Sequence, residues 1–260
     1  MKKNVAGMRR EFIKQSVTIG AGLMLPIINR AKMRYDDKER NLLSEQPAGS
    51  IILFQGDSIT DGNRIKNNTW DQNHQMGHGY AFAIAAELGY QQPEKRFRFF
   101  NRGISGNKLS DLVGRWEQDT LAIKPRVLSI LIGVNDIDAM IQGKQPVDNT
   151  ISQFETEYRA LLKDTRAKLP GCMFIILEPF ILPVGRVKDN WSEWTKVTQE
   201  MQRVVEKVAK DSEALFIPLQ KAFEDAATKA PAEYWIWDGI HPTPAGHELI
   251  AREWIKLVKL

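Results

Sequence analysis

Three residues of this sequence have the types and spacing needed to attack a carbonyl carbon. Ser58 lies in "FQGDSITDGNR", directly after an apolar run. A free serine hydroxyl is a weak nucleophile and needs an adjacent base. The chain has four histidines, and His241 follows Asp238 by three residues in "DGIH". At this spacing one turn can present the carboxylate to Nδ1 of the imidazole and leave Nε2 free to take a proton.

Each of these residues also has an ordinary structural explanation. Ser58 could cap a helix, since serine is favoured at that position. His247 is a rival base, but it lies in the first turns of an amphipathic helical pattern that begins at Pro244, and a packed or capping histidine is favoured there. Asp57 is expected to tie the loop by accepting backbone hydrogen bonds.

Ester hydrolysis further needs N–H donors aimed at the developing oxyanion. The backbone N–H of Ser58, at a predicted helix start, is one candidate. Gly106 in "NRGISGN" offers an N–H that no side chain obstructs, and Asn135 in "IGVND" offers a side-chain amide. Gly106 could instead serve only to allow a positive φ angle, and Asn135 could be a turn residue. Asp136 is expected to be structural.

Short apolar runs alternate with longer helical patterns from residue 50 onward, and this predicts one domain over residues 49–260. The alternation indicates a parallel sheet covered by helices on both faces. The predicted strands are Ser50–Gln55, Arg96–Asn101, Val127–Ile132, Cys172–Leu177 and Ala214–Pro218. The predicted helices are Gly79–Leu88, Leu109–Gln118, Asn149–Lys168, Trp191–Lys210, Leu219–Lys229 and Pro244–Val258.

The candidate residues fall where such a sheet would place a site. Ligands of open α/β sheets bind outside the carboxyl ends of the strands. Ser58, Gly106 and Asn135 each follow a predicted strand, and Asp238 and His241 precede the last helix. The serine is not in a G-x-S-x-G turn, because "GDSIT" lacks the second glycine, so an ordinary α/β-hydrolase is disfavoured.

Taken together, the blocks Gly56-Asp57-Ser58, Gly106, Asn135 and Asp238-x-x-His241 resemble, in order and context, those of the SGNH (GDSL-type) hydrolase family. The resemblance spans about residue 50 to the C-terminus. It implies a flavodoxin-like α/β/α sandwich with a five-stranded sheet in the order 2-1-3-4-5. It also implies Ser58 as nucleophile, His241 as base with Asp238 as its partner, and an oxyanion hole of Ser58, Gly106 and Asn135. No metal or organic cofactor is implied.

Further residues are candidates for substrate contact rather than chemistry. They lie in or beside loops at the predicted active edge: Asp61, Arg64, His78, Trp191, Trp194 and Trp235. Indole rings suit sugar faces, and they also suit ordinary packing. His74 and His78 could bind a metal if both were on one helix, but Gly77 and Gly79 argue against a helix there.

The polar loops favour a small acyl group on a polar alcohol. We therefore expect a serine esterase that removes a short acyl group, acetyl above all, from a carbohydrate through an acyl-enzyme. Plant-polysaccharide deacetylases of the family are similar in their polar loops. Two alternatives are a lysophospholipase or acyl-thioesterase of the same family, and a flavodoxin-like protein that binds a ligand without chemistry.

The basic character of the chain lies in its first residues. Of a formal charge of +4, residues 1–31 contribute +5, from six Lys and Arg residues against one Glu, so the remainder carries −1. This argues against nucleic acid as a partner. "RREFIK" followed by a short apolar run resembles a twin-arginine export signal, too short to span a membrane comfortably. We expect export from a bacterium, to the periplasm or the medium, with residues 32–48 as a polar spacer.

Overall fold

Five short apolar segments form one fully parallel sheet with the strand order β2-β1-β3-β4-β5, which confirms the predicted fold class. The computed structural model describes residues 42–67 and 72–258. The strands lie within two residues of the predicted bounds: β1 (Ile51–Gly56), β2 (Arg98–Asn101), β3 (Val127–Leu131), β4 (Met173–Leu177) and β5 (Leu215–Ile217). Their near-continuous apolar sequences suit strands that are covered on both faces.

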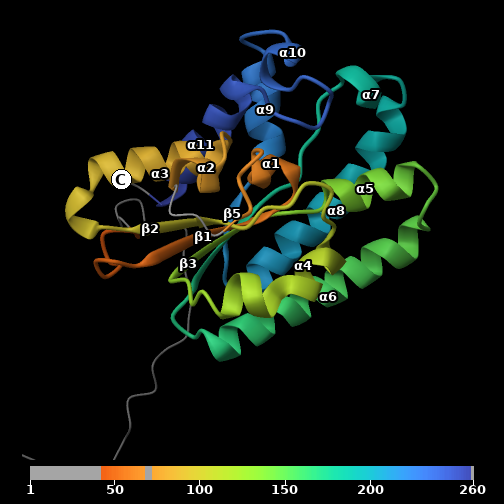
Figure 1. The fold of residues 1–260 in the computed structure, drawn as a ribbon. Coiled ribbons are helices and arrows are strands. Elements are labelled where there is room, and N and C mark those ends of the chain that lie inside the picture. Colours follow the sequence, from red (N-terminus) through yellow and green to blue (C-terminus); the bar gives the residue numbers. More distant parts are fainter. Residues whose placement is uncertain (1–41, 68–71, 259–260) are drawn as a thin grey trace, which may run out of the picture. The chain divides into compact units, whose positions relative to one another are not determined.

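Helices cover both faces of the sheet (Figure 1). Helices α3 and α11 pack together on one face, while α4, α6 and α8 form the layer on the other, and α9 packs against α11. The long helices are α3 (Tyr80–Gln91), α4 (Leu109–Trp116), α6 (Val147–Lys168), α8 (Trp191–Asp211), α9 (Leu219–Ala227) and α11 (Pro244–Val258). All six were predicted from the sequence pattern.

The shorter helices were not predicted as elements, apart from the helix start at Ser58. They are α1 (Ser58–Asp61), α2 (Gln72–Met76), α5 (Val134–Ile141), α7 (Gly185–Lys188) and α10 (Ala232–Trp235), with 3₁₀ turn η1 (Pro93–Lys95). The chain also continues past α4 in a wider turn, η2 (Glu117–Leu121). Apart from α5, which has eight residues, these helices have three to five residues, and so few residues carry too little periodicity to distinguish a helix from a turn.

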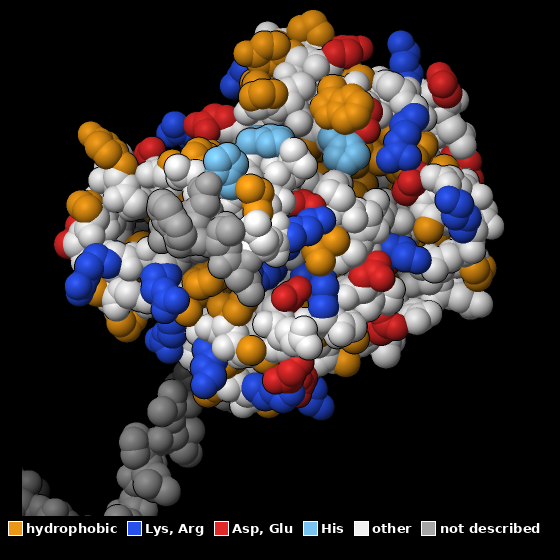
Figure 2. Space-filling model, in the orientation of Figure 1, with side chains coloured by type: hydrophobic (Ala, Val, Ile, Leu, Met, Phe, Trp, Pro, Cys, Tyr) orange, Lys and Arg blue, Asp and Glu red, His pale blue; other side chains and the backbone are white. Residues whose placement is uncertain are grey.

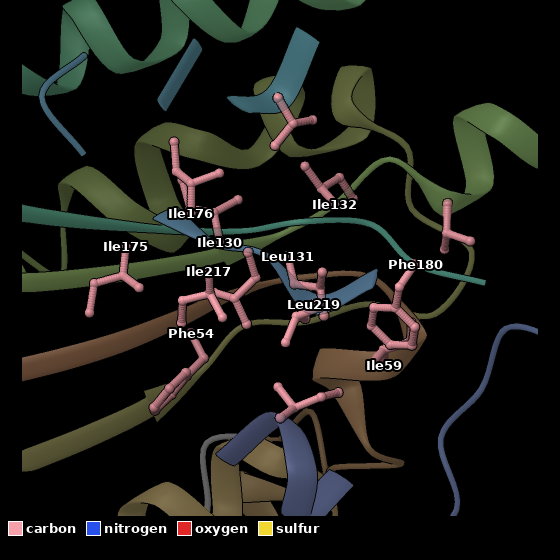
Figure 3. Close-up of a cluster of buried hydrophobic side chains, with 14 of the residues drawn as sticks. Phe54, Ile59, Ile130, Leu131, Ile132, Ile175, Ile176, Phe180, Ile217 and Leu219 are labelled. Atoms are coloured by element: carbon pink, nitrogen blue, oxygen red, sulfur yellow. The ribbon is translucent and has the colours of Figure 1, made fainter. Parts of the chain in front are cut away.

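Apolar side chains of the strands fill the space between the helical layers. Phe54 of β1 packs its ring against Tyr80 of α3 and Trp254 of α11, at centroid distances of 5.9 and 6.0 Å. Figure 3 shows Phe54 with buried side chains of β3, β4 and β5. Burial of each such side chain is worth roughly 1.5–3 kcal/mol. This core gives the loops at the strand ends a rigid base.

Strand β1 lies between β2 and β3 in the sheet. The chain therefore places β2 on one side of β1 and then crosses over to place β3 on the other side. Such a reversal of strand order creates a crevice at the carboxyl ends of the strands. Ser58 follows β1 and Asn135 follows β3. The topology therefore brings these two residues to the same edge.

The start of the described chain packs onto the domain. Leu43 is fully buried, and the N–H of Leu42 donates to the carbonyl oxygen of Val258. These residues belong to the predicted spacer, residues 32–48. The rest of that spacer up to residue 41, and the predicted export signal over residues 1–31, lie outside the described residues.

Candidate active site

Ser58 is the first residue of helix α1, immediately after strand β1. The preceding Asp57 occupies the N-cap position, and its Oδ1 accepts the N–H of Ile59 at 3.0 Å. Asp57 is fully buried, so it ties the loop as expected from the sequence. Because Asp57 is the cap, the hydroxyl of Ser58 is left free for another contact.

That contact is with His241, which lies 183 positions away in the sequence. The Oγ atom of Ser58 is 2.8 Å from Nε2 of His241. On the other side of the ring, Nδ1 is 2.7 Å from Oδ2 of Asp238. Serine, imidazole and carboxylate thus form one continuous hydrogen-bonded line, with the ring between the other two groups.

Asp238 also shapes the turn that carries His241. Its Oδ1 accepts the backbone N–H groups of Ile240 at 3.0 Å and of His241 at 2.7 Å. Burial alone would raise the pKa of Asp238, but the hydrogen bonds from the ring and backbone of His241 and from Ile240 lower it to about 2. Asp238 is therefore a carboxylate at neutral pH, as a group that orients an imidazole must be.

Glycine at position 239 is required by the same turn. Gly239 has φ +96°, and a Cβ there would lie 2.5 Å from the carbonyl oxygen of Val184. The turn is closed by an isolated bridge between Ile236 and Pro242. These contacts hold His241 against the loop that follows β4.

The three candidate oxyanion donors lie on the segments that follow the adjacent strands β1, β2 and β3. Within residues 42–67 and 72–258, the backbone N–H groups of Ser58 and Gly106 make no hydrogen bond. Gly106 has φ +84°, and no atom lies within 4 Å of where a Cβ would be. The side chain of Asn135, near the start of α5, donates from Nδ2 to the carbonyl oxygen of Asn107 at 3.0 Å. That bond uses one of the two amide N–H groups and fixes the other.

Asp61 and Arg64 brace the loop after β2, and their predicted contact with the substrate stays a prediction. Asp61 is 2% exposed, and its Oδ2 accepts both the N–H and the hydroxyl of Ser105 at 3.0 Å. The Nε atom of Arg64 donates to the carbonyl oxygen of Gly103 at 2.9 Å. Asn101 adds bonds from Nδ2 to backbone carbonyls of α1 and α2.

The other predicted substrate residues differ in exposure. His78 is exposed, and Trp191 and Trp235 are half-buried. Trp194 is 3% exposed and packs beneath Arg186, and its predicted contact with the substrate stays a prediction. Its position on the first turn of α8 turns the ring into the core.

Trp237 is the aromatic residue that the sequence reading missed. Its indole is 61% exposed and stacks on the imidazole of His241, with centroids 5.6 Å apart and planes inclined by 20°. Its place directly before Asp238 was a signal that could have identified it.

Figure 2 shows histidine side chains exposed on the face that carries α1 and α2, where acidic and basic side chains are interspersed.

His247 has a structural role, as its helical context predicted. Its Nδ1 accepts the backbone N–H of Tyr80, at the start of α3, at 3.2 Å. Burial, followed by the nearby His78 and His241, lowers the pKa of His247 to about 4. Among the described residues no group of three metal-ligating side chains occurs. Helix α2 ends at Met76 before a left-handed Gly77, so His74 and His78 do not share a helix face.

Two buried carboxyl groups flank the catalytic segments. Asp57 precedes Ser58, and Asp136 follows Asn135 and accepts the N–H of Leu109 at 3.3 Å. Burial raises the pKa of each of these carboxyl groups to about 7.

Comparison with known proteins identifies relatives over most of the domain. The sequence model of the GDSL-like Lipase/Acylhydrolase family matches residues 54–249. The chain is 32% identical over 219 residues to the acetylxylan esterase of Geobacillus stearothermophilus, which covers 80% of this chain and 94% of that protein. In the part of the chain that the structure describes, no helix combines the length and hydropathy needed to cross a bilayer.

Solved structures show the same relationship. A Parabacteroides merdae protein assigned as a GDSL-like lipase superposes with a TM-score of 0.77 at 38% identity, over 82% of this chain and 96% of that one. Axe2, an acetylxylan esterase from Geobacillus stearothermophilus, gives a TM-score of 0.71 at 30% identity, over 82% and 96%. Axe2 variants that replace a serine, an aspartate or a histidine are described as catalytic mutants. In Axe2 that aspartate precedes the histidine by three positions, as Asp238 precedes His241 here.

Proposed function

Because the chain belongs to the GDSL-like lipase/acylhydrolase family, we propose that it is a serine esterase that removes acetyl groups from a carbohydrate. The observation that carries the catalytic part is the hydrogen-bonded line from Ser58 through His241 to Asp238. A binding protein without chemistry would not need this line.

The reaction begins with attack by the Oγ atom of Ser58 on the ester carbonyl carbon. As the new C–O bond forms, Nε2 of His241 takes the hydroxyl proton and the carbonyl π electrons move to the oxygen. The tetrahedral intermediate then expels the sugar oxygen, which takes the proton back from His241. Asp238 keeps the ring in the required tautomer and stabilises the imidazolium.

The oxyanion is held by the N–H groups of Ser58 and Gly106 and by the side-chain amide of Asn135. Donors that are fixed before the reaction need no reorganisation as charge develops, and each is worth about 10²–10³ in turnover. Water, activated by His241, then attacks the acyl-enzyme and releases acetate and free Ser58. These steps require no metal or organic cofactor.

The carbohydrate part of the proposal rests on two observations. The relative at 32% identity is an acetylxylan esterase. The exposed indole of Trp237 lies against His241, where the leaving alcohol would depart. Aromatic rings present a flat apolar face with a polar edge, which suits a sugar ring.

Acetate release from acetylated xylo-oligosaccharides tests the whole proposal, with Ser58→Ala as the inactive control. A fluorophosphonate should label wild-type Ser58 and fail to label His241→Ala. A series of 4-nitrophenyl esters, together with lysophosphatidylcholine and an acyl-CoA, separates the family alternatives. Faster turnover of long acyl chains would overturn the acetyl substrate and leave the esterase chemistry intact, whereas a folded wild-type protein that takes no label would overturn both.

We further propose that the protein is exported from a bacterial cell. This rests on the basic and apolar sequence of residues 1–31. Fusion of those residues to a reporter that is active only outside the cytoplasm, with Arg9 and Arg10 replaced by Lys as the control, is the test. Export that does not change in the control would argue against the twin-arginine route.

A further inference from the structure

One guanidinium lies beneath the segments that carry the proposed oxyanion donors. Arg115, on α4, has a side chain that is 15% exposed. Its Nε donates to Oδ1 of Asn107 at 2.9 Å, and its Nη1 donates to the carbonyl oxygen of Arg102 at 2.7 Å. Its Nη2 reaches the carbonyl oxygen of Gly56 at 3.3 Å. Arg115 therefore contacts the ends of β1 and β2 and the loop between β2 and α4.

The charge and orientation of Arg115 are themselves fixed. Nη1 also lies 2.9 Å from Oδ2 of Asp119 and 3.0 Å from Oε1 of Gln55. Gln55 in turn donates from Nε2 to the hydroxyl of Thr120 at 2.8 Å. Hydrogen bonds from a charged donor are stronger than neutral ones. The planar fork of this side chain thus holds its acceptors in one arrangement.

Asn107 connects this fork to the proposed oxyanion hole. Its side chain accepts from Arg115, while its backbone carbonyl accepts from Nδ2 of Asn135 at 3.0 Å. Gly106 is the residue directly before it in the chain. A shift of Asn107 would therefore move the N–H of Gly106 and the amide of Asn135 together.

The opposite end of the loop has further contacts besides those from Arg115 to Arg102 and Gly56. Asp61 accepts the N–H and hydroxyl of Ser105, and the N–H of Ile104 donates to the carbonyl oxygen of Gly56 at 3.1 Å. At the Asn107 end, Arg115 holds the side chain of Asn107, while the backbone N–H of Asn107 donates to the carbonyl oxygen of Ile104 at 3.1 Å.

We propose that Arg115 is a positioning residue, which sets the two donors Gly106 and Asn135 through Asn107 and does not touch the substrate itself. This proposal rests on the proposed esterase function. Its effect is on the transition state, because the donors bind the oxyanion more strongly than the ground-state carbonyl. A displacement of about 1 Å in such a group can lower turnover about 10²-fold.

The experiment compares Asn107→Ala, Asn107→Asp and Arg115→Lys with wild type on 4-nitrophenyl acetate. Asn107→Ala removes the acceptor of Arg115, whereas Asn107→Asp keeps an oxygen at that position. Arg115→Lys keeps the charge but loses the fork. Ser110→Ala, an exposed position on the same helix, is the matched control. Inhibition by phenylboronic acid, which forms a tetrahedral adduct with a serine, reports on the oxyanion hole directly.

We expect Asn107→Ala and Arg115→Lys to lower kcat by about 10-fold to 100-fold and to leave KM within about twofold of wild type. The inhibition constant of phenylboronic acid should rise by a similar factor. Asn107→Asp should recover most of the lost turnover, and Ser110→Ala should match wild type. Unchanged kcat in a folded Asn107→Ala protein, or a loss that appears only in KM, overturns the proposal. An inactive wild type would instead refute the esterase function.

Discussion

The carboxylate of Asp238 holds both the ring and the backbone of His241. Oδ2 lies 2.7 Å from Nδ1 of the imidazole, and Oδ1 accepts the backbone N–H of the same residue at 2.7 Å. One side chain therefore fixes the position of the base and its tautomer. These two tasks use different oxygen atoms, so they can be separated by substitution.

Asp238→Asn should lower kcat by about 10²-fold to 10⁴-fold and leave the fold intact. The amide keeps an oxygen that can accept the N–H groups of Ile240 and His241, but its NH₂ group cannot accept a hydrogen bond from the N–H at Nδ1 of the imidazole. The imidazole would then adopt the wrong tautomer for a base. Steady-state turnover of 4-nitrophenyl acetate measures the loss.

The thermal unfolding midpoint of Asp238→Asn serves as the control for this prediction. A midpoint within a few degrees of wild type, together with the loss of turnover, supports the tautomer explanation. Turnover near that of wild type would mean that the carboxylate only shapes the turn.

Asn135→Ala should lower kcat about 10²-fold, because it removes one oxyanion donor. The same substitution removes the bond to the carbonyl oxygen of Asn107, whose loss costs about 1 kcal/mol of stability. Kinetics at a temperature well below the unfolding midpoint separate the two effects. If kcat is unchanged there, Asn135 is not part of the oxyanion hole.

Sequence reasoning predicted the parts of the site that depend on strand ends. The carboxyl ends of parallel strands share one edge of a sheet, so segments after β1 and β3 had to meet. Ser58 and Asn135 follow from this rule, and the Asp238–His241 spacing limits the pair to one turn. The distance from Ser58 to His241 required the structure, because it joins residues 183 positions apart.

Sequence reasoning failed where side-chain exposure depends on tertiary packing. Trp194 and Trp237 are the same residue type beside loops of the same edge, yet they are 3% and 61% exposed. Asp61 looked accessible in a polar segment, but the loop after β2 folds over it. The network around Arg115 was not visible, because two of its acceptors are backbone carbonyls, which any residue supplies, and the side chains of Gln55 and Asn107 meet it only through the fold.

Trp237→Ala should weaken use of an acetylated xylo-oligosaccharide more than use of 4-nitrophenyl acetate. The indole offers a sugar ring an apolar face worth about 1–3 kcal/mol, about 5-fold to 150-fold in kcat/KM. The small aromatic ester lacks a sugar and should lose less. The measurement is the ratio of the two kcat/KM values in wild type and variant.

Equal losses on both substrates would contradict this sugar contact. That outcome would indicate that the indole acts on His241 itself, which it stacks upon at 5.6 Å. Trp237→Phe keeps an aromatic ring and is the matched variant, which should retain most of the preference for the oligosaccharide.

His247→Asn should reduce the loss of stability on acidification. Burial lowers the pKa of His247 from 6.5 to about 4. Above pH 6.5 the imidazole is neutral in both the folded and the unfolded chain. Between pH 6.5 and 4 the unfolded chain takes up a proton that the folded chain refuses, so wild type loses about 3 kcal/mol of folding free energy through this group.

The comparison of the two proteins isolates His247 from other titrating groups. Burial raises the pKa values of Asp57 and Asp136 from 3.8 to about 7, so these groups affect stability in the opposite direction. Their contribution to the folding free energy is present at low pH and is lost as the pH rises from the unfolded pKa through about 7. They are present in both proteins and cancel in the difference. The amide side chain of the variant would keep an oxygen near the position of Nδ1, so the acceptor for the N–H of Tyr80 is preserved. Between pH 8 and pH 4, denaturant unfolding should show that wild type loses about 3 kcal/mol more folding free energy than the variant. Equal losses in the two proteins would mean that the folded state does not lower the pKa of His247.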